Sequence, residues 1–204
     1  NQLFVLLPFV LIFSRLIDEW IDSNPDNLPS PWTAARDLMA FLIVEEVGFY
    51  FSHLALHTKF LYQHVHKVHH EFHASIAPAA EYAHPLEFLL SNVSPLFAGP
   101  ILMRSHIVTW WWWTTIALLD TLHSHSGYDF PFSPTSTSVK HEYHHASDLH
   151  CNIGALGIFD RLVGSFRSPS QIKEAKRVSR KGDNSSDDAD HVHSDSCSHH
   201  DHDH

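Results

Sequence analysis

The chain has 204 residues, of which 44% are hydrophobic, with 13 lysine and arginine residues, 23 aspartate and glutamate residues and 21 histidines. Residues 183–204 hold seven acidic residues and no basic ones, so the remainder carries 13 basic against 16 acidic residues. This balance argues against a nucleic-acid-binding surface. The two cysteines, Cys151 and Cys197, form neither a disulfide framework nor a CxxC zinc ribbon, which excludes a disulfide-stapled secreted module.

The first residue is Asn1 rather than methionine, and an apolar stretch covers residues 3–17. This stretch is as long as the core of a signal peptide, but no basic segment precedes it and no small-residue cleavage site follows before Asp18. We therefore favour the end of a truncated membrane helix, since a span needs about 20 apolar residues.

Ser30 and Pro31 are typical of an N-cap and a first helical position, and we expect a helix over residues 32–57. Such a helix would be about 39 Å long and could cross an apolar layer of about 30 Å. Glu45 and Glu46 lie in its middle, where an acid facing lipid is costly, so they must face protein, water or a cation.

Two further apolar blocks cover residues 86–103 and 107–122, and the first is broken by Pro95 and by Gly99 and Pro100. They suggest two helices packed as a hairpin within or against a bilayer. The second block contains four consecutive tryptophans, which favour an interfacial or lipid-facing role over cofactor stacking. Polar, histidine-dense segments, residues 60–85 and 123–150, alternate with the apolar blocks.

From residue 168 onwards the chain is polar, and we expect two parts: a membrane-embedded domain over residues 1–167 and a disordered tail over residues 168–204. The tail contains six histidines, which could bind Zn²⁺ or Cu²⁺ loosely. Since nothing there fixes a coordination geometry, a solvated tail is the preferred interpretation over a metal buffer.

The remaining histidines are concentrated in three short patterns. They are His53 and His57, His66 with His69 and His70, and His141 with His144 and His145. Spacings of three and four residues place imidazoles on one face of a helix, where two side chains can reach the same metal. Two exact copies of HxxHH indicate a metal site. Glu46 and Tyr50 share the helix stripe of His53 and His57.

Eight clustered histidines exceed the four ligands of a structural zinc and suit two adjacent metals. His84 and His125 are isolated but lie beside the polar segments and could complete the two sites. Five other isolated histidines are interpreted as surface or supporting residues: His64, His73, His106, His123 and His150.

Imidazole ligands alone do not choose the metal. A site among membrane helices is well placed for a lipid substrate, and attack on an unactivated C–H bond needs a redox metal and O₂, which favours iron. The seven glycines build neither a GxGxxG motif nor a Walker loop, and a GxSxG elbow is absent from the sequence. Reducing electrons must therefore come from another protein.

The order HLALH, HKVHHEF, EYAHPLE, HSGYDFPFSP, HEYHH and IFDRLVGS resembles the fatty acid hydroxylase/sterol desaturase superfamily of membrane di-iron oxygenases. The resemblance covers roughly residues 38–165. Three of these motifs, HKVHHEF, EYAHPLE and HSGYD, are most similar to the C-4 methylsterol oxidases and to fatty-acid-hydroxylase-domain relatives.

The resemblance implies an all-α, multi-pass protein of the endoplasmic reticulum membrane, with helix hairpins and a cytosolic helical cap that holds two irons. The implied ligands are His53, His57, His66, His69, His70, His84, His125, His141, His144 and His145. Methylsterol oxidases use O₂ and electrons from NAD(P)H through cytochrome b5 or a similar donor, and they oxidise the 4-methyl group of sterol intermediates. Glu46 and Tyr50 could orient the ligands, or Glu46 could be only a packing acid.

The chain departs from many relatives at Leu54, at His73 and at residues 148–150, which leaves the substrate open. The leading hypothesis is a sterol 4-methyl monooxygenase. Its alternative within the superfamily is a hydroxylase or desaturase of an acyl chain, a sphingolipid or another sterol position. Rival classes are a metal transporter or metal-binding membrane protein and an inactive regulatory relative. The position of the ionisable residues distinguishes a transporter from an enzyme. A transporter would have them spread through its spanning helices, whereas the histidine clusters here lie beyond or between the apolar blocks.

Overall fold

The computed structural model describes residues 2–72, 76–128 and 138–179, which fall into two compact units, residues 1–167 and 168–204. The described part of the chain is helical, without a strand, apart from an isolated bridge between Asp22 and His106. The predicted all-α fold is therefore confirmed.

The first unit contains long helices, short helices and single turns of tighter or wider winding. In chain order they are η1 (Gln2–Leu6), α1 (Leu7–Asp18), η2 (Pro25–Asn27), α2 (Pro31–Leu56), α3 (Lys59–His64), η3 (His66–Glu71), η4 (Ala77–Glu81), α4 (Pro85–Glu87), η5 (Phe88–Val93), α5 (Ser94–Met103), α6 (Ile107–Ser124), α7 (Ser138–Ala146) and α8 (Ile158–Val163).

Helix α2 begins where the sequence predicts it. The Oγ atom of Ser30 accepts the backbone N–H of Thr33 at 3.1 Å, and Pro31 occupies the first helical position. The cap satisfies one of the N–H groups that a helix start leaves unpaired. At the other end, His57 closes the helix, so the His53 and His57 pair lies on its last turn.

Residues 85–103 form a continuous helix of 19 residues, although the sequence predicts breaks at Pro95 and Pro100. The helix passes Pro95 because the preceding turn, η5, is wound as a π-helix, in which the N–H of Ser94 reaches the carbonyl of Leu89. Such a wider turn absorbs the loss of a proline N–H. Helix α6 then returns after a turn at Arg104, whose φ of 48° is left-handed, so the predicted hairpin is confirmed.

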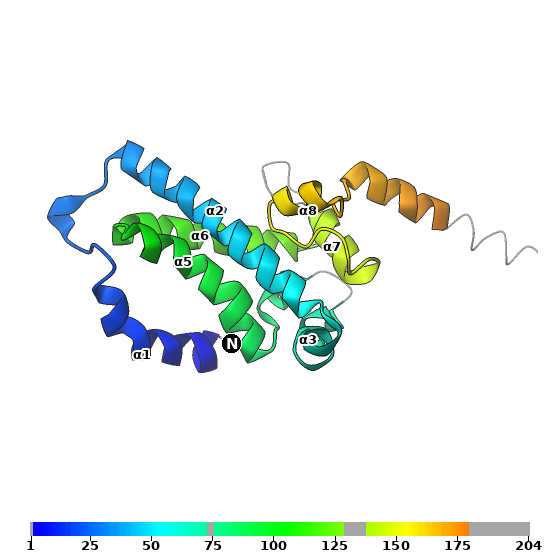
Figure 1. Cartoon of the computed structure of the whole chain (residues 1–204), viewed down its shortest axis with the longest axis horizontal. Coiled ribbons are helices and arrows are strands. Elements are labelled where there is room, and N and C mark those ends of the chain that lie inside the picture. The colour runs from blue at the N-terminus through cyan, green and yellow to red at the C-terminus, as the bar shows by residue number, and fades with distance from the viewer. Residues whose placement is uncertain (1, 73–75, 129–137, 180–204) are drawn as a thin grey trace, which may run out of the picture. The chain divides into compact units, whose positions relative to one another are not determined.

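Helices α2, α5 and α6 run side by side (Figure 1). A Cβ atom on Gly99 would lie 2.7 Å from the Cα atom of Phe41, so α5 and α2 approach as closely as a glycine allows. The core of this layer consists of Phe41, Trp110 and Trp113. The four tryptophans therefore divide: Trp110 and Trp113 are buried, whereas Trp111 and Trp112 are exposed as a lipid-facing role predicts.

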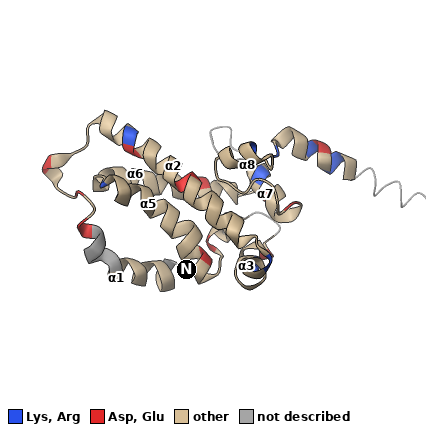
Figure 2. Ribbon diagram, viewed as in Figure 1, with Lys and Arg blue, Asp and Glu red and all other residues tan. Residues whose placement is uncertain are grey.

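Two of these helices are long and apolar enough to cross a membrane, Pro31–Leu56 and Pro85–Met103, and a shorter apolar helix covers Leu3–Ile12. Helix α5 shows no charged residue along its length, and the charges of α2 are confined to short segments (Figure 2). Many large apolar side chains on these helices are exposed, including Phe4 at 88%, Met39 at 59% and Leu102 at 69%. The exposed apolar surface indicates membrane association.

In the second unit, residues 169–179 are helical, where the sequence predicts a disordered segment. This stretch alternates basic and apolar residues at helical spacing and includes an ion pair between Arg177 and Glu174 at 2.8 Å. The remainder of the predicted tail, with its six histidines, lies outside the described residues.

Candidate metal centre

Nine of the ten histidines predicted as ligands gather into two groups near the C-terminal end of α2. The five-histidine group consists of His53, His57, His66, His70 and His144. The four-histidine group consists of His69, His125, His141 and His145. Within each group the ligand atoms all lie within 4.8 Å of one another.

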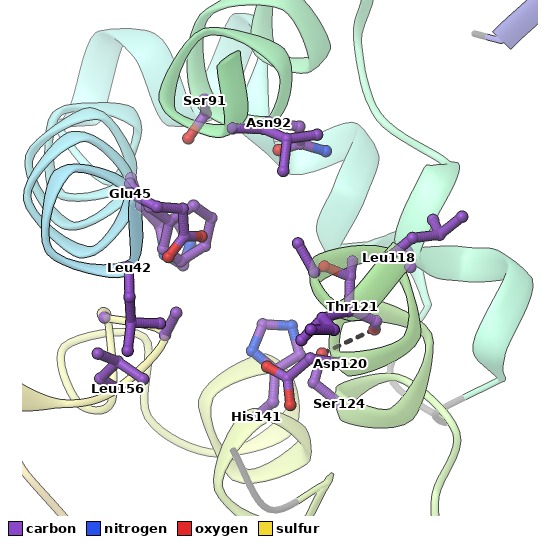
Figure 3. A pocket seen from close by; sticks show the side chains of 18 of the residues that line it. Leu42, Glu45, Ser91, Asn92, Leu118, Asp120, Thr121, Ser124, His141 and Leu156 are labelled. Carbon is purple, nitrogen blue, oxygen red and sulfur yellow. Dashed lines mark hydrogen bonds between the residues drawn. The ribbon is translucent and has the colours of Figure 1, made fainter. Parts of the chain in front are cut away.

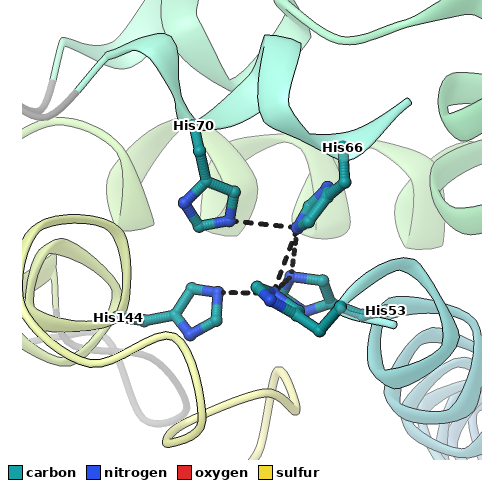
Figure 4. Close-up of side chains that lie close together, drawn as sticks. His53, His66, His70 and His144 are labelled. Atoms are coloured by element: carbon teal, nitrogen blue, oxygen red, sulfur yellow. Dashed lines mark hydrogen bonds between the residues drawn. The ribbon is translucent and has the colours of Figure 1, made fainter. Parts of the chain in front are cut away.

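In the five-histidine group the rings converge through their Nε2 atoms (Figure 4). The Nε2 atom of His66 lies 3.1 Å from that of His53, 3.1 Å from that of His57 and 3.0 Å from that of His70. The Nε2 atom of His57 lies 3.1 Å from that of His144. Nitrogen ligands about 2.0–2.1 Å from one metal are separated by about 3 Å when they meet at right angles. The spacing therefore fits one ion.

The opposite ring nitrogens identify the tautomers. The Nδ1 atom of His53 lies 2.7 Å from the carbonyl oxygen of Ile153, and the Nδ1 atom of His144 lies 2.8 Å from that of Cys151. A carbonyl oxygen only accepts, so both Nδ1 atoms carry the proton and both Nε2 atoms present a lone pair. Lone pairs that converge in a buried space need a cation between them, which these residues are well suited to hold.

The four-histidine group has the same construction. The Nδ1 atom of His69 donates to the carbonyl of Tyr82 at 3.1 Å, and that of His125 donates to the carbonyl of Thr121 at 3.1 Å. Their Nε2 atoms, which carry the lone pairs, lie 3.3 Å apart. The Nε2 atom of His141 lies 2.9 Å from that of His125, which continues the cluster. The donor set of each group thus fits a metal bound by neutral imidazoles.

Burial keeps these imidazoles neutral. Desolvation, followed by the neighbouring imidazoles, lowers the pKa of His57 and of His125 to about 3. The same causes lower the pKa of His66, His144 and His145 far below the usual range. Neutral imidazole is the form that binds a metal, so burial favours the protonation state that a metal site needs.

The two HxxHH copies are used in opposite ways. In the first copy, His66 and His70 join the five-histidine group while His69 crosses to the other. In the second copy, His141 and His145 share the four-histidine group while His144 crosses back. Each copy therefore gives a pair four residues apart to one group and its middle histidine to the other, which ties the two groups together.

His84 falls outside both groups. Its Nδ1 atom accepts the N–H of Leu86 at 3.2 Å and caps α4. The other isolated histidines also lie outside the groups. His106 caps α6, with its Nε2 atom 3.1 Å from the carbonyl of Asn24. The rest of that set is His64, His123 and His150, together with His73, which lies outside the described residues.

Glu46, Tyr50 and His53 are all buried on α2, and the hydrogen bonds of Glu46 in the described part of the chain go to backbone groups and not to a grouped histidine. Glu46 accepts backbone N–H groups of Leu156 and Ile158, as described below. The ring of Tyr50 stacks on Phe159 of α8 at 4.9 Å between centroids.

A carboxylate that the sequence analysis did not single out supports the five-histidine group. The Oε1 atom of Glu87 accepts the Nδ1 proton of His66 at 2.9 Å, and both residues are buried. Glu87 lies on α4, three residues after His84, within the EYAHPLE motif. A ligand histidine usually donates its second N–H to a carboxylate or carbonyl, but Glu87 lies 21 residues from His66 in the chain, so no local spacing in the sequence pairs the two.

A cavity of about 690 Å³ adjoins the two groups, a size within the range of small-molecule sites. His53, His66, His69, His125 and His141 form part of its wall. The rest is mostly apolar and comes mainly from α2, η5, α5, α6 and the loop of residues 152–157, with polar side chains from Glu45, Ser91, Asn92, Asp120 and Thr121 among them (Figure 3). A largely apolar cavity that ends on the two histidine groups is suited to a lipid substrate.

The fold and the site define a membrane-associated helical protein with two buried histidine groups that could hold metal ions. The model of the fatty acid hydroxylase family matches residues 38–165, and the chain belongs to that family. This span contains all nine grouped histidines.

Individual relatives carry different names. The human fatty acid hydroxylase domain-containing protein 2 is 37% identical over 177 residues, which cover 87% of this chain and 52% of the relative. A Dictyostelium discoideum protein named as a candidate methylsterol monooxygenase is 36% identical over 90% of this chain and 71% of its own length. The rice very-long-chain aldehyde decarbonylase GL1-8 is 43% identical over 58% of this chain and 47% of the relative.

This chain spans about half the length of the curated human relative that it matches. No solved structure is significantly similar to it.

Proposed function

We propose that this chain is the catalytic domain of a membrane-bound, O₂-dependent lipid monooxygenase with two irons, and that its substrate is the 4-methyl group of a sterol intermediate. The observation that carries the proposal is the meeting of two histidine groups with the wall of one apolar cavity. Family membership and the name of the Dictyostelium relative support the chemistry and the substrate class.

The five-histidine and four-histidine groups would hold one iron each, and His84 stays a predicted further ligand. Iron bound there would supply the O₂ activation that oxidation of an unactivated C–H bond requires. The backbone carbonyls and Glu87 hold the histidines in the tautomer that presents Nε2. The apolar wall of the cavity would hold the lipid with its reacting carbon close to the histidines.

Selectivity must come from the cavity, because a C–H bond offers no hydrogen-bond handle. Glu45 lines the cavity and has no hydrogen-bond partner among the described residues. The Oε2 atom of Glu87, another lining residue, also lacks one in the described part of the chain. A buried acid without a partner is costly, and a hydroxyl can pair with a carboxyl whichever of them holds the proton. These acids would therefore bind the hydroxyl of a sterol.

The apolar helices would place the domain in the endoplasmic reticulum membrane as a multi-pass protein, with the histidine groups in a cytosolic cap. Electrons would come from NAD(P)H through cytochrome b5 or a similar protein. The grouping of the nine histidines at one place, rather than along the spanning helices, supports a catalytic centre over a metal-transport path.

The test uses the full natural chain, purified in detergent and loaded with Fe²⁺ under nitrogen. We expect about two irons per chain and, with O₂ and an electron donor, oxidation of a 4-methylsterol. Product analysis by mass spectrometry would run in parallel on a 4-methylsterol, a fatty acyl substrate and a sphingolipid. The His57→Ala variant is the matched control for chemistry that does not depend on the centre.

Each outcome decides between the candidates. Oxidation of the acyl chain or of the sphingolipid alone would establish the second candidate of the same superfamily. Two bound irons without oxidation of any of the three lipids would contradict the proposed reaction. Failure to bind metal would contradict the proposed centre itself.

A further inference from the structure

The loop of residues 151–157, here called the carbonyl loop, supplies the acceptors for two ligands of the five-histidine group. The carbonyl oxygen of Cys151 accepts from His144, and that of Ile153 accepts from His53. We propose that Asp160 and Glu46 are positioning residues that fix this loop and thereby control metal binding at the five-histidine group alone. The inference rests on the proposed metal centre.

Asp160 holds the middle of the carbonyl loop. Its side chain is fully buried on α8. The Oδ1 atom accepts the N–H of Ile153 at 3.0 Å and the hydroxyl of Ser165 at 2.6 Å, while the Oδ2 atom accepts the N–H of Gly154 at 2.8 Å. Both oxygens of one carboxylate are thus bonded to consecutive backbone N–H groups. This fork fixes the peptide whose carbonyl faces His53.

Glu46 holds the end of the same loop from α2. It is 1% exposed, and its Oε2 atom accepts the N–H of Leu156 at 2.8 Å while its Oε1 atom accepts the N–H of Ile158 at 2.9 Å. Glu46 lies seven residues before His53 on the same helix, about 10 Å along the axis. Helix α2 therefore carries both the ligand His53 and the acid that secures the acceptor of that ligand.

Gly154 leaves no spare room between the two acids. A Cβ atom at this position would lie 3.0 Å from Oε1 of Glu46, 3.2 Å from Oδ2 of Asp160 and 3.3 Å from Cδ2 of Tyr50. The loop backbone therefore lies close to both carboxylates, at a position where a side chain larger than that of glycine would crowd them.

Loss of the carbonyls has a chemical consequence for the ligands. Without an acceptor beside Nδ1, the rings of His53 and His144 can rotate or move the proton to Nε2, which removes the lone pair from the metal. The four-histidine group takes its acceptors elsewhere, from Tyr82 beside η4 and from Thr121 on α6. The two groups should therefore respond differently when the carbonyl loop is disturbed.

The experiment measures Fe²⁺ binding to the full natural chain in two backgrounds that isolate each group. The His141→Ala background disables the four-histidine group, and the His57→Ala background disables the five-histidine group. Adding Asp160→Asn should weaken the remaining site about 10- to 100-fold in the His141→Ala background and leave it unchanged in the His57→Ala background. An amide can accept only one of the N–H groups and turns a donor towards the other.

Two further variants keep the test decisive. Glu46→Gln should show the same selectivity with a smaller loss, and it replaces Asp160→Asn if that variant loses helical circular dichroism. Asp37→Asn is the matched control, because Asp37 is 2% exposed but pairs with Arg36 at 2.7 Å near the start of α2. It should leave Fe²⁺ binding unchanged in both backgrounds.

Equal loss from both groups, or no loss from either, in a folded variant would overturn the inference. If the unsubstituted chain binds no iron, the proposed function fails instead, so the two failures are distinguishable.

Discussion

The imidazole rings of His70 and His145 stack face to face, with centroids 4.2 Å apart and planes inclined by 23°. His70 belongs to the five-histidine group and His145 to the four-histidine group. The two groups therefore share a wall of stacked rings instead of forming two remote sites. Metals bound in them would be neighbours, as a reaction that needs two metals requires.

The crossed use of the HxxHH copies can be tested by pairing substitutions. His144→Ala should act together with His66→Ala, because both remove ligands from one ion, so the double variant should lose little more metal than either single variant. His144→Ala combined with His141→Ala should lose both ions, because these residues serve different groups. The measurement is iron per chain by mass spectrometry.

The opposite result would be an additive loss of iron in the His144→Ala, His66→Ala double variant and no additional loss in the His144→Ala, His141→Ala double variant. It would show that each HxxHH copy serves a single metal. The assignment of His144 to the five-histidine group would then be wrong.

The sequence predicts which histidines gather better than it predicts how they divide between the two groups. Spacings of three and four residues mark His66, His69 and His70 as a chelating set, because they lie one turn apart on a helix. Which ion each ring serves depends on how η3 and α7 face each other, a tertiary relationship that no local spacing contains. His57 and His144 show such a relationship: they are 87 residues apart in the chain, yet their Nε2 atoms lie 3.1 Å apart.

Stability of the metal-free chain should depend on pH. Burial lowers the pKa of His57 and His125 to about 3 in the folded chain, whereas the unfolded chain binds protons near pH 6.5. Below pH 6.5 the unfolded state therefore binds protons that the folded state does not bind. The free energy of unfolding then falls as pH falls towards 3. Each such histidine contributes a slope of up to about 1.4 kcal/mol per pH unit.

Thermal unfolding of the metal-free chain between pH 7.5 and 5 would measure this fall. The metal-loaded chain is the control, and it should lose iron only at a pH well below 6.5. A melting temperature of the metal-free chain that does not change between pH 7.5 and 5 would contradict the neutral, buried state of the histidines.

Gly99→Ala should destabilise the helix layer. The added Cβ would lie 2.7 Å from the Cα atom of Phe41, and a backbone atom cannot move aside as a side chain can. We expect a loss of about 1–3 kcal/mol from such overpacking. Denaturant unfolding in detergent measures it, with Leu102→Ala as the control, because Leu102 lies on the same helix and is 69% exposed. A larger loss for Leu102→Ala would refute the close approach of α5 and α2.

Deletion of residues 183–204 should leave iron content and turnover unchanged, even though it removes six histidines and seven acidic residues. The nine grouped histidines lie between residues 53 and 145, outside the deleted segment. Iron per chain and product formation are the readouts, with His69→Ala as the contrasting variant that should abolish turnover. A deletion that lost iron as His69→Ala does would assign the tail a role in the centre.

The positions of the helices follow from local sequence rules, whereas the groups that support the histidines do not. The cap at Ser30 and the apolar run behind it predict α2 to within a residue or two. The sequence marks Glu46 as a buried acid on the right face, yet its partners are N–H groups of Leu156 and Ile158, more than a hundred residues away. The carbonyls of Cys151 and Ile153 carry no side-chain signature, so sequence patterns cannot reveal them. At Pro95 the local rule itself is wrong: the sequence predicts a break in the helix, but the π turn before the proline lets the helix continue.

The central claim, a metal-dependent oxidase of sterol 4-methyl groups, is tested most directly by sterol profiling. Cells that lack their own C-4 methylsterol oxidase would be complemented with the full natural chain, and their sterols measured by mass spectrometry. We predict loss of the accumulated 4-methylsterols with the unsubstituted chain and no loss with His69→Ala or His144→Ala. Persistent 4-methylsterols in cells that contain stable, iron-loaded protein would contradict the claim.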